Sequence, residues 1–194
     1  MTLQLTKKHS FDLVFDSQKV FRLVLEAMSN PARDAVIKEY ADKLFGSFPV
    51  FLAVALTLLD NEVSFNTCEN QTLSNEIASL TLSRKTNIEE ADFIFASNYS
   101  VMEKAINNAK CGTLADPHKS ATVIIQNNGI SALCLMLSGP GIDGQVEFMV
   151  TQTVKDAITI RDAQNYEYPQ GIDLLFVSGL GEMFAIPRLV KVVE

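Results

Sequence analysis

Residues 121–150 have the sequence ATVIIQNNGISALCLMLSGPGIDGQVEFMV, and this stretch decides the fold class. Short runs rich in apolar and β-branched residues, bounded by turn residues, predict strands at 121–126, 132–138 and 145–150. The segment Asn127-Asn128-Gly129 predicts a hairpin, because Asn and Gly tolerate the positive φ that tight hairpin turns require. Hairpins therefore dominate this part of the chain.

Upstream of that stretch, helical and strand-like patterns alternate. Apolar residues at helical spacing, or in continuous apolar runs, predict helices at about 18–28, 49–59, 74–82 and 101–109, with strands at 63–66 and 92–96. Asp16 or Ser17 is expected to cap the first helix, and Pro31 to end it. Downstream, the pattern predicts a helix at 154–161 and a second hairpin from 172–177 and 183–186.

Helices and strands alternate in the first part of the chain, and hairpins dominate the later part. This order predicts a mixed β-sheet flanked by helices, an α/β/α sandwich, rather than a purely parallel sheet. A length of 194 residues with 47% hydrophobic residues favours a single domain over residues 1–194. The longest apolar run, 48–59, is too short to span a bilayer and is expected to form a buried helix.

The net charge and the cysteine spacing indicate which compartment and which binding partners to expect. The formal net charge is −7 without a basic stripe, so nucleic acid is a poor partner. Cys68, Cys111 and Cys134 are widely spaced and are expected to be buried free thiols in a reducing compartment. Residues 1–10 lack the apolar core of a signal peptide. We therefore expect a cytoplasmic protein that is not bound to a membrane.

The segment Gly139–Gly144 matches the dinucleotide-binding pattern G-x-G-x-x-G. That chemistry needs a helix to begin at the glycines, so that its amides meet the pyrophosphate. A strand-like alternation follows instead, and we interpret the segment as a fixed glycine turn.

Catalytic and metal-binding patterns are weak. Of the two histidines, His9 is expected in a frayed end and His118 in a solvated loop. No metal-ligand spacing occurs, and Glu89, Glu90 and Asp92 are interpreted as a solvated edge. Lys119 and Lys155 are the least implausible Schiff-base lysines, and both are interpreted as surface charges. We therefore expect no catalytic centre, cofactor or metal.

Arg188 follows Pro187, which fixes φ after the last predicted strand and so gives the arginine a defined direction. Two interpretations stay open: a surface ion pair, or a contact with an anionic ligand or a carboxylate of another subunit. Asp173, Gly139 and Gly141 are the other candidates for this anion or subunit contact.

A series of stretches runs in order from about residue 18 to 188: FRLVLEAMSNP at 21–31, LTLLDNE at 56–62, GT at 112–113, ATVII at 121–125, LSGPGI at 137–142, YPQGIDL at 168–174 and AIPR at 185–188. Together they resemble the PhnH family of phosphonate metabolism proteins, whose members are components of the carbon–phosphorus lyase core complex. The sequence departs from the family pattern at Ala32, where glycine is usual, and at Leu189-Val190, which replace Thr-Thr.

The resemblance implies a fold similar to the large domain of PLP-dependent aminotransferases, without the cofactor site. It also implies a homodimer that joins subunits G, I and J. Their complex forms ribose 1-phosphonate 5-triphosphate from ATP and an alkylphosphonate, and this chain would be a non-catalytic structural subunit of it. A stand-alone cytosolic small-molecule enzyme and a ligand-sensing domain remain as alternatives.

Overall fold

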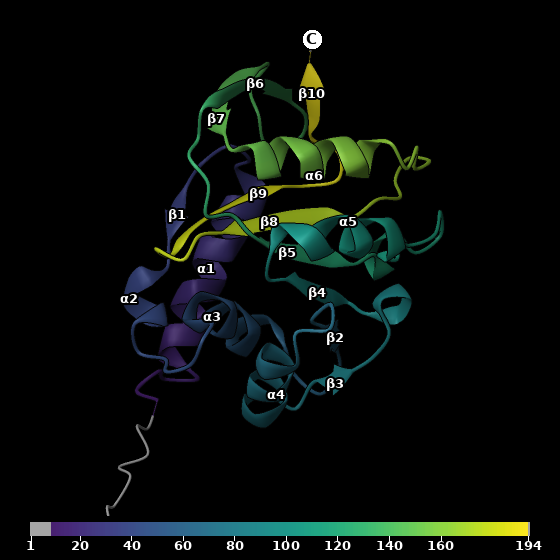
Figure 1. Cartoon of the computed structure of the whole chain (residues 1–194). Helices are drawn as coiled ribbons and strands as arrows, with labels where there is room; N and C mark the ends of the chain where they lie inside the picture. Colours follow the sequence, from purple (N-terminus) through teal and green to yellow (C-terminus); the bar gives the residue numbers. More distant parts are fainter. Residues whose placement is uncertain (1–8, 194) are drawn as a thin grey trace, which may run out of the picture.

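The computed structural model describes residues 9–193, which form a seven-stranded and a three-stranded sheet with helices around them (Figure 1). In spatial order, the large sheet contains β1 (Ala35–Val36), β9 (Glu182–Ile186), β8 (Asp173–Val177), β5 (Thr122–Gln126), β4 (Phe93–Ala96), β2 (Ser64–Asn66) and β3 (Arg84–Lys85). The small sheet contains β10 (Lys191–Val193), β6 (Leu133–Ser138) and β7 (Val146–Val150). The helices are α1 (Phe15–Ser29), α2 (Lys38–Ala41), α3 (Pro49–Leu58), α4 (Gln71–Leu80), α5 (Tyr99–Asn108) and α6 (Gln152–Asp162).

The large sheet is mixed, as the sequence predicts. Strands β3, β2, β4, β5 and β8 are parallel, whereas β9 pairs antiparallel with β8 and β1 pairs antiparallel with β9. The parallel strands require helical crossovers, and those crossovers cover the two faces of the sheet. The result is a mixed sheet flanked by helices.

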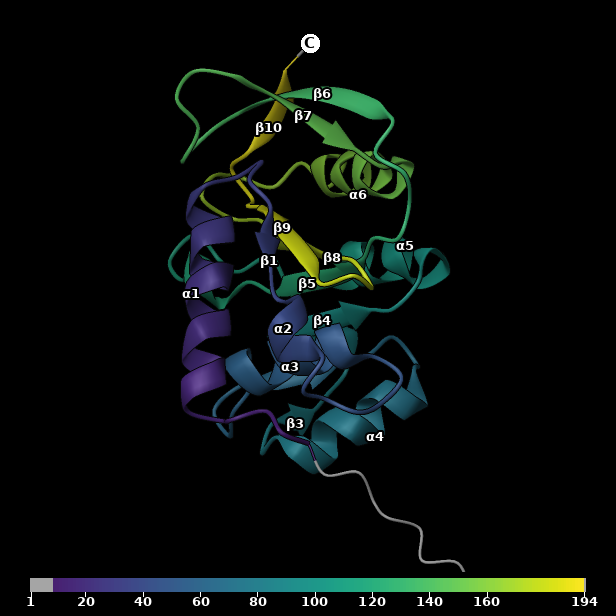
Figure 2. The ribbon, with the colours of Figure 1, turned by 90° about the vertical axis from the view of Figure 1, so that its left-hand side faces the viewer.

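The two faces of the large sheet support separate cores. Successive residues of a strand point to opposite faces, so Leu175 and Val177 contact the layer of α1, α3 and α4, while Leu174 and Phe176 contact the layer of α5 and α6. The small sheet lies beyond α6, on that second side (Figure 2). Helix α3 is buried from Val50 to Ala55, which confirms the prediction of a core helix.

The N-terminus of α1 differs from the prediction. The helix begins at Phe15 rather than near residue 18, and neither Asp16 nor Ser17 caps it. The Asp12 carboxylate accepts hydrogen bonds from the backbone N–H groups of Val14 and Phe15, each at 2.8 Å. Asp16 instead accepts hydrogen bonds from the Asp12 N–H and from Lys43 Nζ. The capping carboxylate therefore lies upstream of the apolar periodicity that located the helix.

The hairpin predicted at Asn127–Gly129 is wrong. Strand β5 belongs to the large sheet and β6 to the small one, so these residues connect two sheets. Their amides are used in tertiary contacts: the Asn127 side-chain oxygen accepts from Thr151 Oγ1 at 2.6 Å, and that of Asn128 accepts from the Gly179 N–H at 2.8 Å. The local turn signal is real, but tertiary partners direct the chain away from a hairpin.

Strands β6 and β7 form the hairpin instead, and Gly139–Gly144 is its turn, as the interpretation of that segment predicts. The second predicted hairpin, β8 and β9, is also confirmed. Cys68 is buried, but Cys134 is exposed, opposite Met149 on the outer face of the small sheet. The expected burial of Cys134 is wrong because this apolar run has only one covered face. No helix within residues 9–193 combines the length and apolar content needed to cross a bilayer.

Candidate functional site

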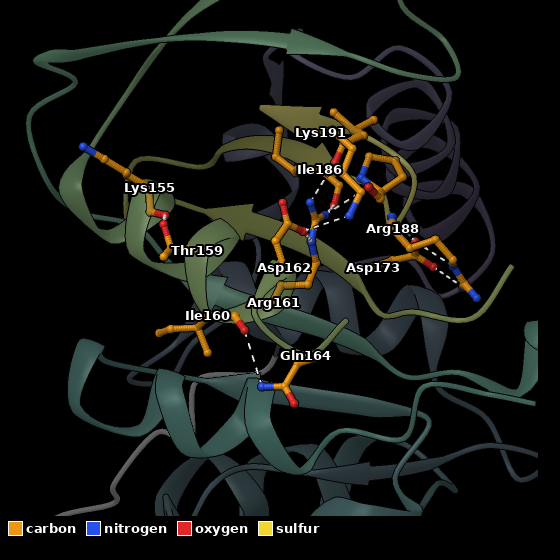
Figure 3. Close-up of polar contacts among 12 residues, drawn as sticks. Lys155, Thr159, Ile160, Arg161, Asp162, Gln164, Asp173, Ile186, Arg188 and Lys191 are labelled. Carbon is orange, nitrogen blue, oxygen red and sulfur yellow. Dashed lines mark hydrogen bonds and ion pairs between the residues drawn. The ribbon is translucent and has the colours of Figure 1, made fainter. Parts of the chain in front are cut away.

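The residues that the sequence singles out gather where the parallel strands begin. Asp173 is the first residue of β8, Asp92 precedes β4, and Arg188 follows β9, which runs antiparallel to β8. Arg161, near the end of α6, faces the same region (Figure 3). We call Asp92, Arg161, Asp173 and Arg188 the amino-edge network.

Asp173 and Arg188 bind each other. The Arg188 backbone N–H donates to Asp173 Oδ1 at 2.9 Å, Nε donates to the same oxygen at 3.2 Å, and Nη2 donates to Oδ2. The remaining terminal nitrogen, Nη1, donates to the Pro117 carbonyl at 2.6 Å. Both side chains are largely buried: that of Arg188 is 18% exposed and that of Asp173 is 12% exposed. The pair therefore joins β8, the segment after β9 and the loop before β5, in a two-point geometry that only arginine offers.

Arg161 is the site residue that the sequence reasoning missed. Its side chain is 1% exposed, and its guanidinium donates to the carbonyls of Ile186, Pro187 and Val190 at 2.7–3.1 Å and to Asp162 Oδ1 at 2.9 Å. Val154, Ala157 and Ile158 share its buried helix face. The sequence signal for its burial was its position: Arg161 occupies the next place in the helical pattern of apolar residues formed by Val154, Ala157 and Ile158.

Gly139 and Gly141 allow the β6–β7 turn to lie against other segments. Their φ values are +140° and +85°, a region that glycine enters without a Cβ penalty. A Cβ on Gly139 would lie 2.7 Å from the Leu189 carbonyl oxygen, and one on Gly141 would lie 2.4 Å from the Ser29 carbonyl oxygen. Gly139 therefore packs against the segment that follows Arg188, and Gly141 packs against the end of α1.

A cavity of about 280 Å³ lies next to the network, lined in part by Arg161, Tyr166, Tyr168, Arg188 and Lys191. Burial raises the pKa of the Tyr166 phenol to about 12, so the phenol stays protonated at neutral pH. Lys191 Nζ contacts Asp162 at 3.3 Å. The cavity is basic, but its two arginines already donate to protein acceptors.

Asp92 departs from the solvated edge expected for it. Its carboxylate accepts from the Ser64 N–H and Oγ, both at 2.7 Å, and from Lys110 Nζ. Burial acts to raise the pKa of Asp92, but the hydrogen bonds from Lys110 and Ser64 outweigh it and hold that pKa below its ordinary value. Glu89 and Glu90 are exposed, as expected.

The other candidates do not converge. His118 is exposed on a short 3-10 turn, Pro117–Lys119, and Lys119 pairs with Asp116 at 2.9 Å. Lys155 is exposed on α6. His9 is not frayed, since its Nδ1 accepts from the Phe45 N–H at 3.0 Å. Within residues 9–193, no group of three or more His, Cys, Asp or Glu side chains is arranged to hold a metal.

A second cavity, of about 460 Å³, lies at the opposite ends of the parallel strands. We call it the carboxyl-edge cavity; it is lined by Asp34, Asn127, Asn128, Gly129, Ser131, Phe148, Met149, Ser178, Gly179, Leu180, Glu182 and Phe184. The sequence reasoning missed it. The available signal was Glu182, which alternates with Phe184 and Ile186 on the face of β9 that is otherwise apolar.

Comparison with known proteins finds two similarities. A family described as "Bacterial phosphonate metabolism protein (PhnH)" matches residues 9–193. A protein of Stutzerimonas stutzeri named "Putative C-P lyase subunit protein HtxG" is 27% identical over 172 residues, which cover 88% of this chain and 83% of that protein. Both similarities extend over nearly all of the chain.

Proposed function

This chain belongs to the PhnH family of bacterial phosphonate metabolism proteins, and on that premise we propose that it is a non-catalytic structural subunit of a carbon–phosphorus lyase core complex. In this proposal it works in the cytoplasm as a homodimer with subunits G, I and J. The assembled complex would form ribose 1-phosphonate 5-triphosphate from ATP and an alkylphosphonate. The fold would be a single domain similar to that of PLP-dependent aminotransferases, without their cofactor.

The observation that carries the proposal is how the amino-edge network uses its arginines. Arg188 donates to Asp173 and Pro117, and Arg161 donates to three backbone carbonyls and Asp162. A guanidinium has five N–H donors. Three of them in Arg188 and four in Arg161 donate to acceptors of the chain itself, which supports a structural role over a catalytic one.

The outer face of the small sheet also supports a role in assembly. Cys134 and Met149 lie opposite each other on it and are exposed, and Met136 shares this face. Flexible, polarisable side chains of this kind adapt well to partner surfaces, and apolar groups that remain exposed together mark interaction sites. This face is where we expect a partner subunit to bind.

The test compares the isolated chain with the complex. The chain is purified alone and with subunits G, I and J, and each preparation is assayed for conversion of ATP and methylphosphonate. We expect product only from the complex, and no complex activity when this chain is omitted. Formation of the triphosphate–ribose product by the isolated chain would overturn the proposal in favour of a stand-alone enzyme.

A pair of surface variants tests the assembly face. Met149→Glu replaces an exposed apolar side chain of this face with a carboxylate, and Leu82→Glu is the matched control, since Leu82 is 84% exposed in the loop between α4 and β3. We expect Met149→Glu to weaken co-purification at least about tenfold, whereas Leu82→Glu leaves it unchanged. Equal recovery of both variants with the partner subunits would exclude this face.

A further inference from the structure

The carboxyl-edge cavity lies where open α/β sheets bind ligands. Strands β5 and β8 end side by side, with Gln126 paired to Val177, and the segments that follow them line the cavity. Strand β7 of the small sheet adds Phe148 and Met149 from the other side. Crevices beyond the carboxyl ends of parallel strands are the usual ligand sites of such folds.

The charged residues that line this cavity are both acidic. Glu182 begins β9 and pairs with Val36, and Asp34 lies two residues before Val36, so the two carboxyl groups occupy the same side of this strand pair. Glu182 Oε2 accepts from Ser178 Oγ at 3.2 Å, while no hydrogen bond or ion pair to the Asp34 carboxylate occurs within residues 9–193. Partial burial, and next the charge of Glu182, raise the pKa of Asp34. Both side chains are exposed, so they give the cavity a negative charge that solvent and a ligand can reach.

The apolar part of the cavity is aromatic. Phe148 packs edge-on against Phe184 with ring centroids 5.0 Å apart, and Phe184 stacks on Phe176 at 5.1 Å. Phe184 follows Glu182 by two residues on the same face of β9, so a ring and a carboxylate line the cavity together. Aromatic rings and carboxylates both attract cations, and rings also accept an apolar body.

The amide groups of the cavity lining are fixed. The Asn127 and Asn128 oxygens already accept internal hydrogen bonds from Thr151 and Gly179. The strong acceptors that remain for a ligand are therefore the carboxylates of Asp34 and Glu182. A phosphonate or another anion would be repelled by them, whereas a positively charged nitrogen would be attracted.

We propose that the carboxyl-edge cavity binds a small organic ammonium compound, with the ammonium held between Asp34 and Glu182 and its aromatic or aliphatic body against Phe148 and Phe184. The cavity volume of about 460 Å³ is within the range of small-molecule sites. Met149 belongs both to the lining of this cavity and to the proposed assembly face, but the ammonium site is argued from Asp34, Glu182 and the two rings and does not rest on the assembly role.

Three probes with the same body but different charge test the site. Phenethylamine, phenethyl alcohol and 3-phenylpropionate are titrated into the ¹⁵N-labelled full chain while its amide resonances are followed. We expect phenethylamine alone to shift the signals of residues 127–129 and 178–184 saturably. Equal shifts with the alcohol would show an apolar pocket without cation recognition and would overturn the proposal. No shift with phenethylamine would also overturn it.

Variants assign the effect to the carboxylates. Glu182→Gln and Asp34→Asn keep the side-chain shapes and remove one charge each, and Asp143→Asn is the control, because Asp143 is an exposed carboxylate outside the cavity. We expect either cavity variant to weaken phenethylamine binding about tenfold, which corresponds to about 1.4 kcal/mol. Unchanged binding in Glu182→Gln, with native spectra for the protein, would contradict the assignment.

Discussion

The acidic residues at the two ends of the parallel strands differ in their partners. At the amino edge, Asp92 and Asp173 are paired with Lys110 and Arg188. At the carboxyl edge, Asp34 and Glu182 face a cavity whose lining, within residues 9–193, contains no Lys, Arg or His. The first edge is a closed network, and the second is open to a ligand.

The difference shows that a conspicuous arginine can belong to the architecture. Arg188 has a sequence context typical of a contact residue, yet three of its five guanidinium donors are used within the chain. The open site is built from residues that look ordinary in sequence, since a lone acidic residue at a strand start is common on protein surfaces. Binding sites are better recognised by charged groups that lack an ion-pair partner in the described chain than by charge alone.

The substitution Arg161→Met tests the amino-edge network most directly, and we expect it to cause the largest loss of unfolding free energy. The substitution removes the donors to the Ile186, Pro187 and Val190 carbonyls, of which Pro187 keeps its hydrogen bond from the Val190 N–H, and it removes the nearest cation of Asp162. Removing one side of such a buried network costs about 3–5 kcal/mol of unfolding free energy. Urea unfolding measures it, with Lys155→Met, at an exposed position of the same helix, as the control. A loss under about 1 kcal/mol would show that the network is dispensable.

For Arg188→Met or Asp173→Asn we expect a smaller loss of unfolding free energy, about 2 kcal/mol, because solvent partly reaches both side chains. If the two residues act as a unit, the double variant loses clearly less than the sum of the single losses. Additive losses in this double-mutant cycle, measured by urea unfolding, would mean that the pair is not coupled.

The pH dependence of stability is expected to differ in sign between the edges. The folded-state pKa of Asp92 is lowered from 3.8, so its stabilising contribution is present above that value and lost as the pH falls through the folded pKa. The folded-state pKa of Asp34 is raised from 3.8, so the native state binds the extra proton. Its penalty is relieved as the pH falls through the raised pKa and grows as the pH rises.

Urea unfolding across the acid range, with Asp92→Asn and Asp34→Asn, separates these two effects. We expect Asp92→Asn to make stability less sensitive to acid, and Asp34→Asn to remove a decline that sets in as the pH rises above 3.8. Changes of the same sign in both variants would break the contrast between the edges.

The smallest effect on stability is expected for Glu182→Gln at neutral pH. The Glu182 side chain is exposed and accepts one hydrogen bond, from Ser178 Oγ, so its loss changes unfolding free energy by only a few tenths of a kcal/mol. Relief of repulsion with Asp34 offsets part of even that. A loss above about 1 kcal/mol would show that the carboxyl edge is structural as well.

Local signals in the sequence predict much of the fold. Pro49 with the apolar run after it predicts α3, and the strand runs around Gly179 and Gly181 predict the β8–β9 hairpin. Asn127–Gly129 misled because hydrogen bonds from Thr151 and Gly179, distant in sequence, decide the direction of that segment. Division of the strands between two sheets depends on such contacts, which periodicity does not encode.

The candidate site was predicted in part. Asp173 pairs with Arg188, and Gly139 packs against the segment after Arg188, whereas Gly141 packs against the end of α1. The pairing of Asp173 with Arg188 follows from the antiparallel register of β8 and β9, across 15 residues of chain. Arg161 was missed because a single arginine on an apolar helix face needs partners that only the folded chain supplies. Asp34 joins the carboxyl-edge cavity through β1, a strand too short to predict from its pattern.

We interpret the amino edge as architectural, and one measurement tests that interpretation directly. Arg188→Met is assembled with subunits G, I and J at a temperature where the variant stays folded, and turnover is measured per assembled complex. We predict the wild-type rate per complex, with a lower midpoint of thermal unfolding for the variant. A folded, fully assembled complex that has lost its turnover would contradict the account and place Arg188 in the chemistry.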